Sequence, residues 1–198
     1  MTPGKKTMAS PATVDFSRLQ AAPVTVSAKG ATNSPLTING AAVYWAPGEP
    51  MECAFEPRAY DGSADVSRVS LCLRPTQAVL SQLDALDTAI LNIAQQSSQA
   101  VFNKELTRDQ ISDRYVSPIK TSPSHPPLVR PKINLSGANP FRFWDNAGRR
   151  AELPEHWAGG SVTTRLCVKG LWFSQGQFGC LVEIHDAHVH LVAEQCPF

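Results

Sequence analysis

Residues 165–180 constrain the fold of this chain more than any other stretch of its sequence. They read as one strand, a tight turn containing Gly176 and the start of a second strand. Two cations and three aromatic residues are interleaved within them: Arg165, Lys169, Trp172, Phe173 and Phe178. Such a combination suits a single-stranded nucleic acid, because cations hold phosphates and rings stack on bases. An aromatic hairpin is also a common way to build a sheet core, so both interpretations stay open.

The overall composition is typical of a soluble globular protein. The 198 residues are enough for one domain with a core, and 42% of them are hydrophobic and 18% charged. No run approaches the roughly 18 apolar residues that a membrane-spanning helix needs. The first ten residues lead into no apolar segment of a secretory signal. We therefore expect an intracellular protein with no membrane contact.

Charge is distributed unevenly along the chain, although the formal net charge is only +1. Residues 114–169 hold nine Lys and Arg against three acids, a net of +6. Residues 181–198 hold three acids and neither Lys nor Arg. A local positive region can bind phosphates even when the total is near zero. A normally solvated surface is the alternative interpretation.

The sequence contains no recognisable catalytic motif. The Gly-Lys-Ser/Thr phosphate loop, the GxGxxG fingerprint and the Gly-x-Ser-x-Gly elbow are all missing. The five cysteines are widely spaced, which indicates free thiols in a reducing compartment. His185, His188 and His190 are the best metal candidates, but no second cluster at ligand spacing accompanies them. We expect no enzyme activity, no metal and no cofactor.

Hydrophobic periodicity predicts strands, then a helical insert, then strands again. Apolar residues from Val79 to Ile93 recur every three or four positions, which predicts a helix starting near Pro75. A capping box at Thr107 and Gln110 predicts a second helix that ends at about Val116. Strand patterns occupy residues 22–44 (with a turn at 39–40), 66–73, 132–135, 141–144 and 189–192.

The predicted fold is a mainly β domain over residues 13–198, in which one long and one short helix cover the sheet. The helical insert spans residues 75–116. Residues 117–131 contain five prolines and are expected to form an exposed connector. Residues 1–12 are expected to be a disordered tail.

Strand alternation assigns the candidate rings to faces. Trp172 shares a face with Leu166 and Val168, which favours the core. Phe173 lies on the face of the two cations of the same strand and is the better stacking candidate. In the strand at 141–144, Arg142 and Trp144 share a face and form a pair suited to a nucleotide.

Three blocks of the sequence resemble the single-stranded-DNA-binding proteins of large DNA viruses, which are relatives of the phage-type replication proteins. The blocks are GLWFSQGQFGC at 170–180, FNKEL at 102–106 followed by YVSPIK at 115–120, and PKINL at 131–135 after the proline-rich connector. The likeness covers residues 75–192 with the order of elements preserved. It implies an OB-fold-like, five-stranded barrel with a positively charged, ring-bearing face for unpaired strands. By matching position, it implies roles as rings for Trp172, Phe173 and Phe178. It likewise implies roles as cations for Lys104, Lys120, Lys132 and Lys169.

The protein is expected to bind single-stranded DNA with tolerance of sequence. By doing so it would coat and protect unpaired strands during viral DNA replication or recombination. The setting would be the nucleus or a cytoplasmic replication site of the infected host cell. The candidate binding residues, from the alternation and the resemblance together, are Trp144, Phe173, Trp172, Phe178, Arg142, Arg149, Arg150, Arg165, Lys169, Lys132, Lys120 and Lys104.

Other partners and functions stay open. RNA is an alternative ligand, and a homo-oligomer is compatible with the sequence. Phage-type relatives recruit replication proteins through an acidic tail with a terminal aromatic residue. Here Phe198 is terminal but Glu194 is the only acid in the last eight residues. A viral structural or scaffold protein that uses the β-domain for protein contacts is the alternative function, and a nuclease or metal-dependent hydrolase ranks third.

Overall fold

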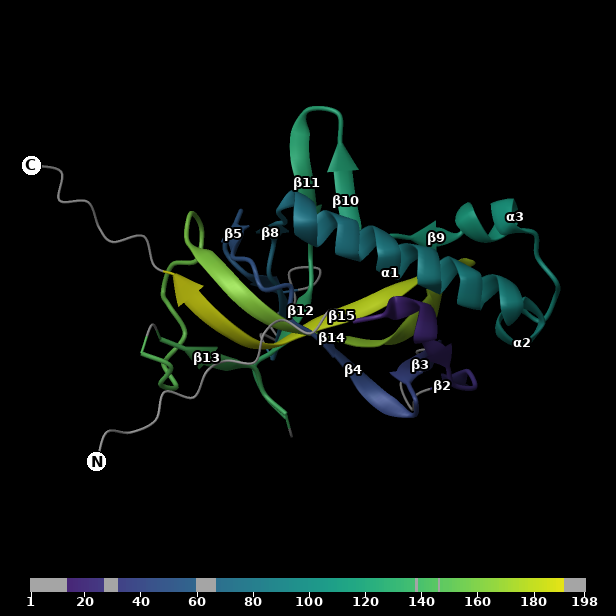
Figure 1. Cartoon of the computed structure of the whole chain (residues 1–198), viewed down its shortest axis with the longest axis horizontal. Helices are drawn as coiled ribbons and strands as arrows, with labels where there is room; N and C mark the ends of the chain where they lie inside the picture. Colours follow the sequence, from purple (N-terminus) through teal and green to yellow (C-terminus); the bar gives the residue numbers. More distant parts are fainter. Residues whose placement is uncertain (1–13, 27–31, 60–66, 138, 146, 191–198) are drawn as a thin grey trace, which may run out of the picture.

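The computed structural model describes residues 14–26, 32–59, 67–137, 139–145 and 147–190, and it is mainly β (Figure 1). The described residues form fifteen strands in one mixed sheet and three α-helices. In chain order the elements are the 3₁₀ turn η1 (Phe16–Arg18), β1 (Gln20–Ala21), β2 (Thr25–Val26), β3 (Thr32–Ile38), β4 (Ala41–Trp45), β5 (Met51–Cys53), β6 (Arg58–Ala59), β7 (Arg68–Ser70), β8 (Leu73–Arg74), α1 (Gln77–Gln96), α2 (Ser98–Phe102), α3 (Arg108–Ser112), β9 (Tyr115–Val116), β10 (Ile119–Ser122), β11 (His125–Val129), β12 (Lys132–Asn134), β13 (Arg142–Trp144), β14 (Ser161–Ser174) and β15 (Gln177–His190).

The long hairpin β14–β15 lies in the middle of the sheet. The sequence predicts this hairpin. Its two-residue turn consists of Gln175 and Gly176, which both have positive φ angles of 50° and 78°. Positive φ at both positions is the geometry of a type I′ turn, whose twist matches that of the two strands. The other expected turn, at Asn39 and Gly40, has the same geometry and joins β3 to β4. Six of the thirteen other described strands pair directly with this hairpin: β3, β4 and β5 with β14, and β9, β12 and β13 with β15.

The sheet is not the closed five-stranded barrel that the resemblance implies. Its main path runs β10-β11-β8-β5-β14-β15-β12-β7-β6, with six further strands attached at its sides. The structure has more strands than the sequence predicts, partly because the chain bends within a predicted strand. The single strand predicted over 66–73 is divided into β7 and β8 at Leu71 and Cys72.

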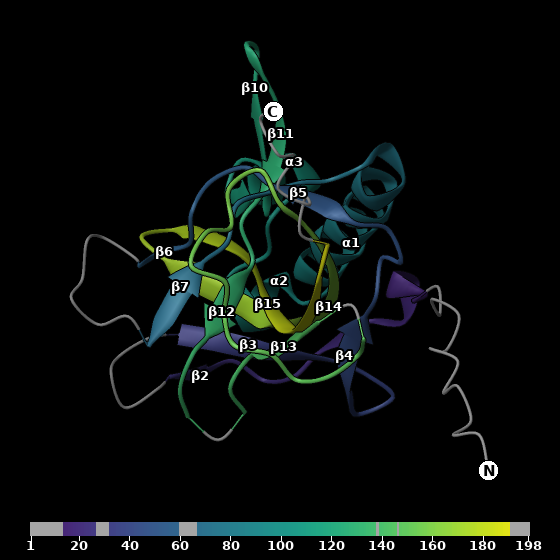
Figure 2. The same ribbon diagram turned by 90° about the vertical axis from the view of Figure 1, so that its left-hand side faces the viewer.

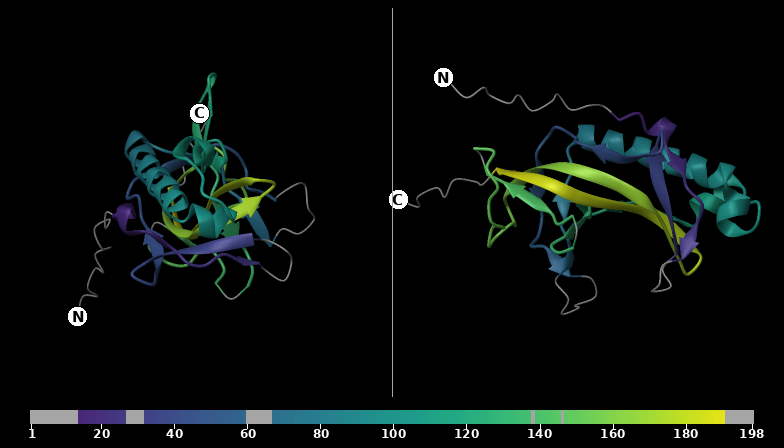
Figure 3. Two further views of the ribbon diagram at one scale, coloured as in Figure 1. Left: turned by 90° about the vertical axis from the view of Figure 1, so that its right-hand side faces the viewer. Right: turned by 90° about the horizontal axis from the view of Figure 1, so that it is seen from below.

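Helix α1 covers one side of the sheet, and Figure 3 shows it lying along the β14–β15 hairpin. Its N-cap is Thr76, whose hydroxyl accepts a hydrogen bond from the Val79 N–H. The predicted apolar stripe, from Val79 to Ile93, is buried in the hydrophobic core. Among the described residues, no helix combines the length and apolar character needed to cross a membrane.

Two expectations for residues 107–131 are wrong. Helix α3 has the predicted capping box at Thr107 but ends at Ser112, because Tyr115 and Val116 pair with β15 as strand β9. The proline-rich connector is instead the β10–β11 hairpin, which projects beyond α1 (Figure 1). Its prolines are tolerated because β11 pairs with the rest of the sheet only at Val129.

Two other expectations concern residues outside the described part of the chain. These are the disordered tail at residues 1–12 and the C-terminal segment that includes Phe198.

Candidate nucleic-acid interface

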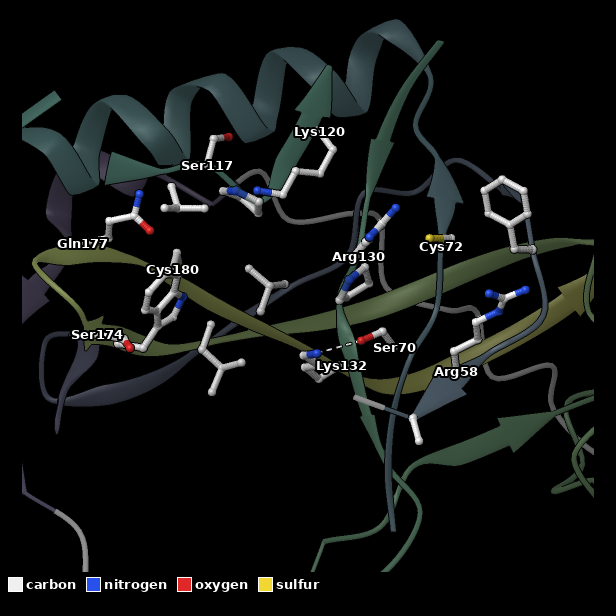
Figure 4. A pocket seen from close by; sticks show the side chains of 18 of the residues that line it. Arg58, Ser70, Cys72, Ser117, Lys120, Arg130, Lys132, Ser174, Gln177 and Cys180 are labelled. Carbon is white, nitrogen blue, oxygen red and sulfur yellow. Dashed lines mark hydrogen bonds between the residues drawn. The ribbon is translucent and has the colours of Figure 1, made fainter. Parts of the chain in front are cut away.

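A groove of about 980 Å³ runs beside the β14–β15 hairpin, and we call it the cationic groove. Residues from five separate stretches of the chain line it: Phe55, Glu56, Arg58, Ala59, Ser70, Cys72, Val116, Ser117, Pro118, Lys120, Arg130, Pro131, Lys132, Trp172, Ser174, Gln175, Gln177, Cys180, Leu181 and Val182. Figure 4 shows Ser174, Gln177 and Cys180 at one end of this groove and Arg58 and Cys72 at the other.

Four cations line the groove and come from three stretches of the chain. Arg58 is on β6, Lys120 on β10, Lys132 on β12, and Arg130 lies between β11 and β12. Arg58 and Arg130 form no ion pair with any described residue. Lys132 donates from Nζ to Oγ of Ser70 at 2.7 Å. These side chains present a positive lining to a ligand in the groove.

Glu56 is the one acid among the described residues that line the groove, and its carboxylate is already engaged. It accepts hydrogen bonds from the backbone N–H groups of Ala158 and Trp157 at 3.1 and 3.0 Å. These hydrogen bonds lower the pKa of Glu56. Glu56 thus holds the loop before β14. With four cations against this one carboxylate, the groove has an excess of positive charge.

Trp172 lies in the groove because of a β-bulge that the alternation argument misses. The β14–β15 register shifts between Val168 and Gly170, so Lys169 is an extra residue with no partner in the register. The bulge moves every later residue of β14 to the opposite face. Trp172 therefore points away from the core, whereas Phe173 points towards it.

The structure corrects two ring assignments on this hairpin. Phe178 is completely buried, so it cannot stack on a base. Phe173 is partly buried against the core and stacks on Phe178, with ring centroids 6.1 Å apart. Phe102 contacts both rings edge-on. These three phenylalanines stabilise the hairpin against the helical insert.

A partly buried carboxylate fixes one wall of the groove. Asp87 on α1 accepts hydrogen bonds from the hydroxyls of Tyr115 at 2.6 Å and Ser117 at 2.5 Å. Burial raises the pKa of Asp87, and these two hydrogen bonds and Lys120 oppose the rise. Asp87 thereby holds the segment from which Ser117 and Lys120 line the groove.

A second, smaller pocket of about 280 Å³ gathers three of the predicted arginines. Arg142, Arg150 and Arg165 line it together with Tyr44, Asn139, Pro140 and His185, and we call it the arginine–tyrosine pocket. Asp186 binds Arg142 through two hydrogen bonds of 2.7 and 2.9 Å and Arg165 through one of 3.2 Å. The Arg165 guanidinium lies 4.2 Å from the centre of the Tyr44 ring, a cation–π contact.

The remaining predicted residues lie elsewhere. The Trp144 indole N–H donates to Asp186 at 3.1 Å, so the predicted Arg142/Trp144 pair shares a carboxylate. Arg149 is paired with Asp145 at 2.9 Å. Lys169 lies 3.9 Å from Glu183. Lys104 is exposed in the turn after α2 and lines neither surface.

Sequence reasoning missed Phe55, Arg58 and Arg130 in the groove and Tyr44 in the pocket. Arg58 lies outside the basic segment 114–169, and its neighbours in the groove are distant in sequence. Arg130 lies within that basic segment, and this is the sequence signal that points to it.

The histidines of β15 are not placed as a metal site. Among the described residues, no group of three or more His, Cys, Asp or Glu side chains could hold a metal ion. His188 and His190 contact each other edge-on, and His190 is also 2.9 Å from the hydroxyl of Thr163.

Solved structures similar to this chain are phage single-stranded-DNA-binding proteins, at very low sequence identity. The protein of bacteriophage Enc34, solved in complex with single-stranded DNA, has a TM-score of 0.50 and 10% identity. That match covers 88% of this chain and 97% of the phage protein. A C-terminally truncated form of the Enc34 protein gives a TM-score of 0.50 at 11% identity, over 88% of this chain and 96% of that one. The gp2.5 protein of bacteriophage T7 gives 0.46 at 11% identity, over 78% and 92% of the two chains.

Comparison of the sequence with protein-family models identifies a family for this chain. No curated protein matches the chain. The model of a family of unknown function, DUF5871, matches residues 63–197, which include α1, the β10–β11 hairpin and the whole β14–β15 hairpin. The chain therefore belongs to this family, DUF5871.

Proposed function

We propose that this protein binds single-stranded DNA in the cationic groove. The observation that carries the proposal is the lining of that groove: Arg58, Lys120, Arg130 and Lys132 beside two partly exposed rings, Trp172 and Phe55. Phe55 is 48% exposed. Cations and exposed rings in one groove are what an unpaired strand needs, whereas a duplex hides the faces of its bases.

In this proposal, the phosphates contact the four cations and the bases stack on the rings. Each stacked base contributes about 1–3 kcal/mol regardless of its identity, because every base has a π-face. The binding would therefore be tolerant of sequence. Gln177 and Ser174, at one end of the groove, offer hydrogen-bond donors to base edges.

We also propose that the sheet is a partly open, OB-like barrel. The support is the bent segment between β7 and β8, which bonds to both arms of the sheet. The Leu71 N–H donates to the Pro131 carbonyl at 3.1 Å, and the Ala54 N–H donates to the Cys72 carbonyl at 2.9 Å. In the end-on view of Figure 2, β5, β14, β15, β12 and β7 lie around a common centre, which supports the same arrangement.

The biological role we propose is stoichiometric coating of unpaired DNA during viral replication or recombination, without catalysis. Two observations support it: the sequence resemblance to viral proteins of that class and the fold shared with the Enc34 protein, whose solved complex contains single-stranded DNA. The protein would act in the infected host cell. A scaffold role without nucleic acid is the outcome that a negative binding test would favour.

The test is a fluorescence anisotropy titration of labelled oligo(dT) and of a matched duplex, at about 50 and about 200 mM salt. We expect tighter binding to the single strand and weaker binding at the higher salt. Trp172→Leu should weaken binding by about 5- to 150-fold, the equivalent of one lost stacking contact. Lys104→Gln is the matched control outside the groove and should stay within about twofold of the wild type. Equal affinity of Trp172→Leu and wild type would contradict the assignment of the groove.

A further inference from the structure

The arginine–tyrosine pocket and the cationic groove lie on the same face of the sheet. Residues that face each other across paired strands point to the same side. The register aligns one row across six strands, in the order Tyr44 on β4, Cys167 on β14, Glu183 on β15, Lys132 on β12, Ser70 on β7 and Arg58 on β6. This row starts at a ring of the pocket and ends at a cation of the groove.

The row lies on the outer face of the sheet, because its neighbours in β14 and β15 point inwards. Leu166, Val168, Val182 and Ile184 all belong to the hydrophobic core. Strands are spaced about 4.8 Å apart, so the five steps from Tyr44 to Arg58 span about 24 Å along the sheet. An extended nucleic acid strand can follow a path of that length.

The acid in the middle of the row does not interrupt its positive character. Glu183 is 4% exposed and lies 2.5 Å from Arg68 and 3.9 Å from Lys169. Lys132 faces it from β12. The exposed parts of this middle region are therefore the side chains of Arg68 and Lys169, not the carboxylate.

The arginine–tyrosine pocket still has N–H donors available for a phosphate and an exposed ring available for a base. A guanidinium has five N–H donors, and Asp186 uses two of Arg142 and one of Arg165. Arg150 forms no ion pair with any described residue. The Tyr44 ring is 39% exposed and is held by Arg165 and by an edge contact with His185 at 5.2 Å. Because these contacts already fix the ring, its side chain loses little conformational entropy when a base stacks on it.

We propose that the DNA strand continues from the cationic groove across Arg68 and Lys169 into the arginine–tyrosine pocket, where Tyr44 stacks on a base and Arg150, with Arg142 and Arg165, binds phosphates. This inference rests on the proposed function. It adds a second subsite for the same strand, and it makes affinity depend on oligonucleotide length.

The experiment is an anisotropy titration with labelled oligo(dT) of increasing length, from about 4 to about 16 nucleotides, the range of site sizes seen for OB folds. The proteins compared are the wild type, Tyr44→Ala and Arg150→Gln, with Tyr44→Phe and Lys104→Gln as matched controls. Tyr44→Phe keeps the ring, and Lys104→Gln removes a charge outside both surfaces. Thermal melting of each variant shows that it is folded; Arg150 is exposed, so its substitution leaves the core intact.

We expect Tyr44→Ala to leave binding of the shortest oligonucleotide within about twofold of the wild type and to weaken the longest by about 5- to 150-fold. Arg150→Gln should weaken the longest oligonucleotide in the same direction. If neither variant changes binding at any length, or if both weaken all lengths equally, the second subsite is wrong while the proposed function stands. If the wild type binds no oligonucleotide of any length, the proposed function itself fails.

Discussion

The indole of Trp172 lies directly against Gly179 on the neighbouring strand. A Cβ atom at position 179 would be 2.6 Å from ring atom Cζ2 of Trp172 and 2.6 Å from the Val116 carbonyl oxygen. Only glycine leaves room there for the ring and for strand β9 together. The absence of a side chain at Gly179 thus places the main ring of the cationic groove.

Gly179→Ala is therefore expected to destabilise the protein by about 1–3 kcal/mol, the usual cost of overpacking. Chemical denaturation measures it. The same substitution in a Trp172→Leu background should cost less, because the clash with the ring is gone and only that with Val116 remains. Equal costs in both backgrounds would mean that Trp172 does not rest on Gly179.

The two neighbouring rings of β14 should behave in opposite ways. Phe173→Leu removes a contact with Phe102 and Phe178, so it should lower the free energy of unfolding by about 1–2 kcal/mol and leave DNA affinity nearly unchanged. Trp172→Leu should lower DNA affinity with a smaller effect on stability. Denaturation and anisotropy on both variants give the comparison, and loss of DNA affinity in Phe173→Leu would reverse the assignment of faces.

This pair of residues shows how far the sequence carries a prediction. Periodicity is sufficient for the long hairpin and for α1, because local pattern determines both elements. The bulge at Lys169 has no sequence signal that the alternation argument can detect, yet it exchanges the faces of Trp172 and Phe173. The groove also depends on long-range pairing, because Arg58 and Lys132 meet through Ser70 on β7.

Arg130 should contribute one phosphate contact to the bound strand. Each neutralised phosphate of a single strand contributes about 0.7 to the slope of log K against log salt concentration. Arg130→Gln should therefore reduce that slope by about 0.7, because one cation no longer displaces counterions. Anisotropy titrations at several salt concentrations measure the slope, with Lys104→Gln as the variant expected to keep it. An unchanged slope in Arg130→Gln would exclude this residue from the phosphate path.

Asp87 should make stability depend on pH in an unusual direction for a carboxylate. Burial raises its pKa above the ordinary value of 3.8, so the folded protein holds this proton more tightly than the unfolded chain. The stability contributed at this site is then greatest below pH 3.8 and falls as the pH rises through the raised pKa.

Asp87→Asn removes this titration, so the wild type should lose stability relative to the variant as the pH rises through that window. Urea denaturation of both proteins at a series of pH values measures the difference. Because Asp87 also anchors Ser117, the variant should bind oligo(dT) more weakly. Parallel pH curves for the two proteins would contradict the role of burial at this carboxylate.

The central claim is that an unpaired strand lies in the cationic groove, and photo-crosslinking tests it most directly. Wild-type protein is irradiated with oligo(dT) that carries 5-iodouracil, and the crosslinked residues are identified by mass spectrometry. We predict crosslinks at Trp172 and Phe55, the two rings that line the groove. Crosslinks confined to residues outside both surfaces, such as those around Lys104, would contradict the account.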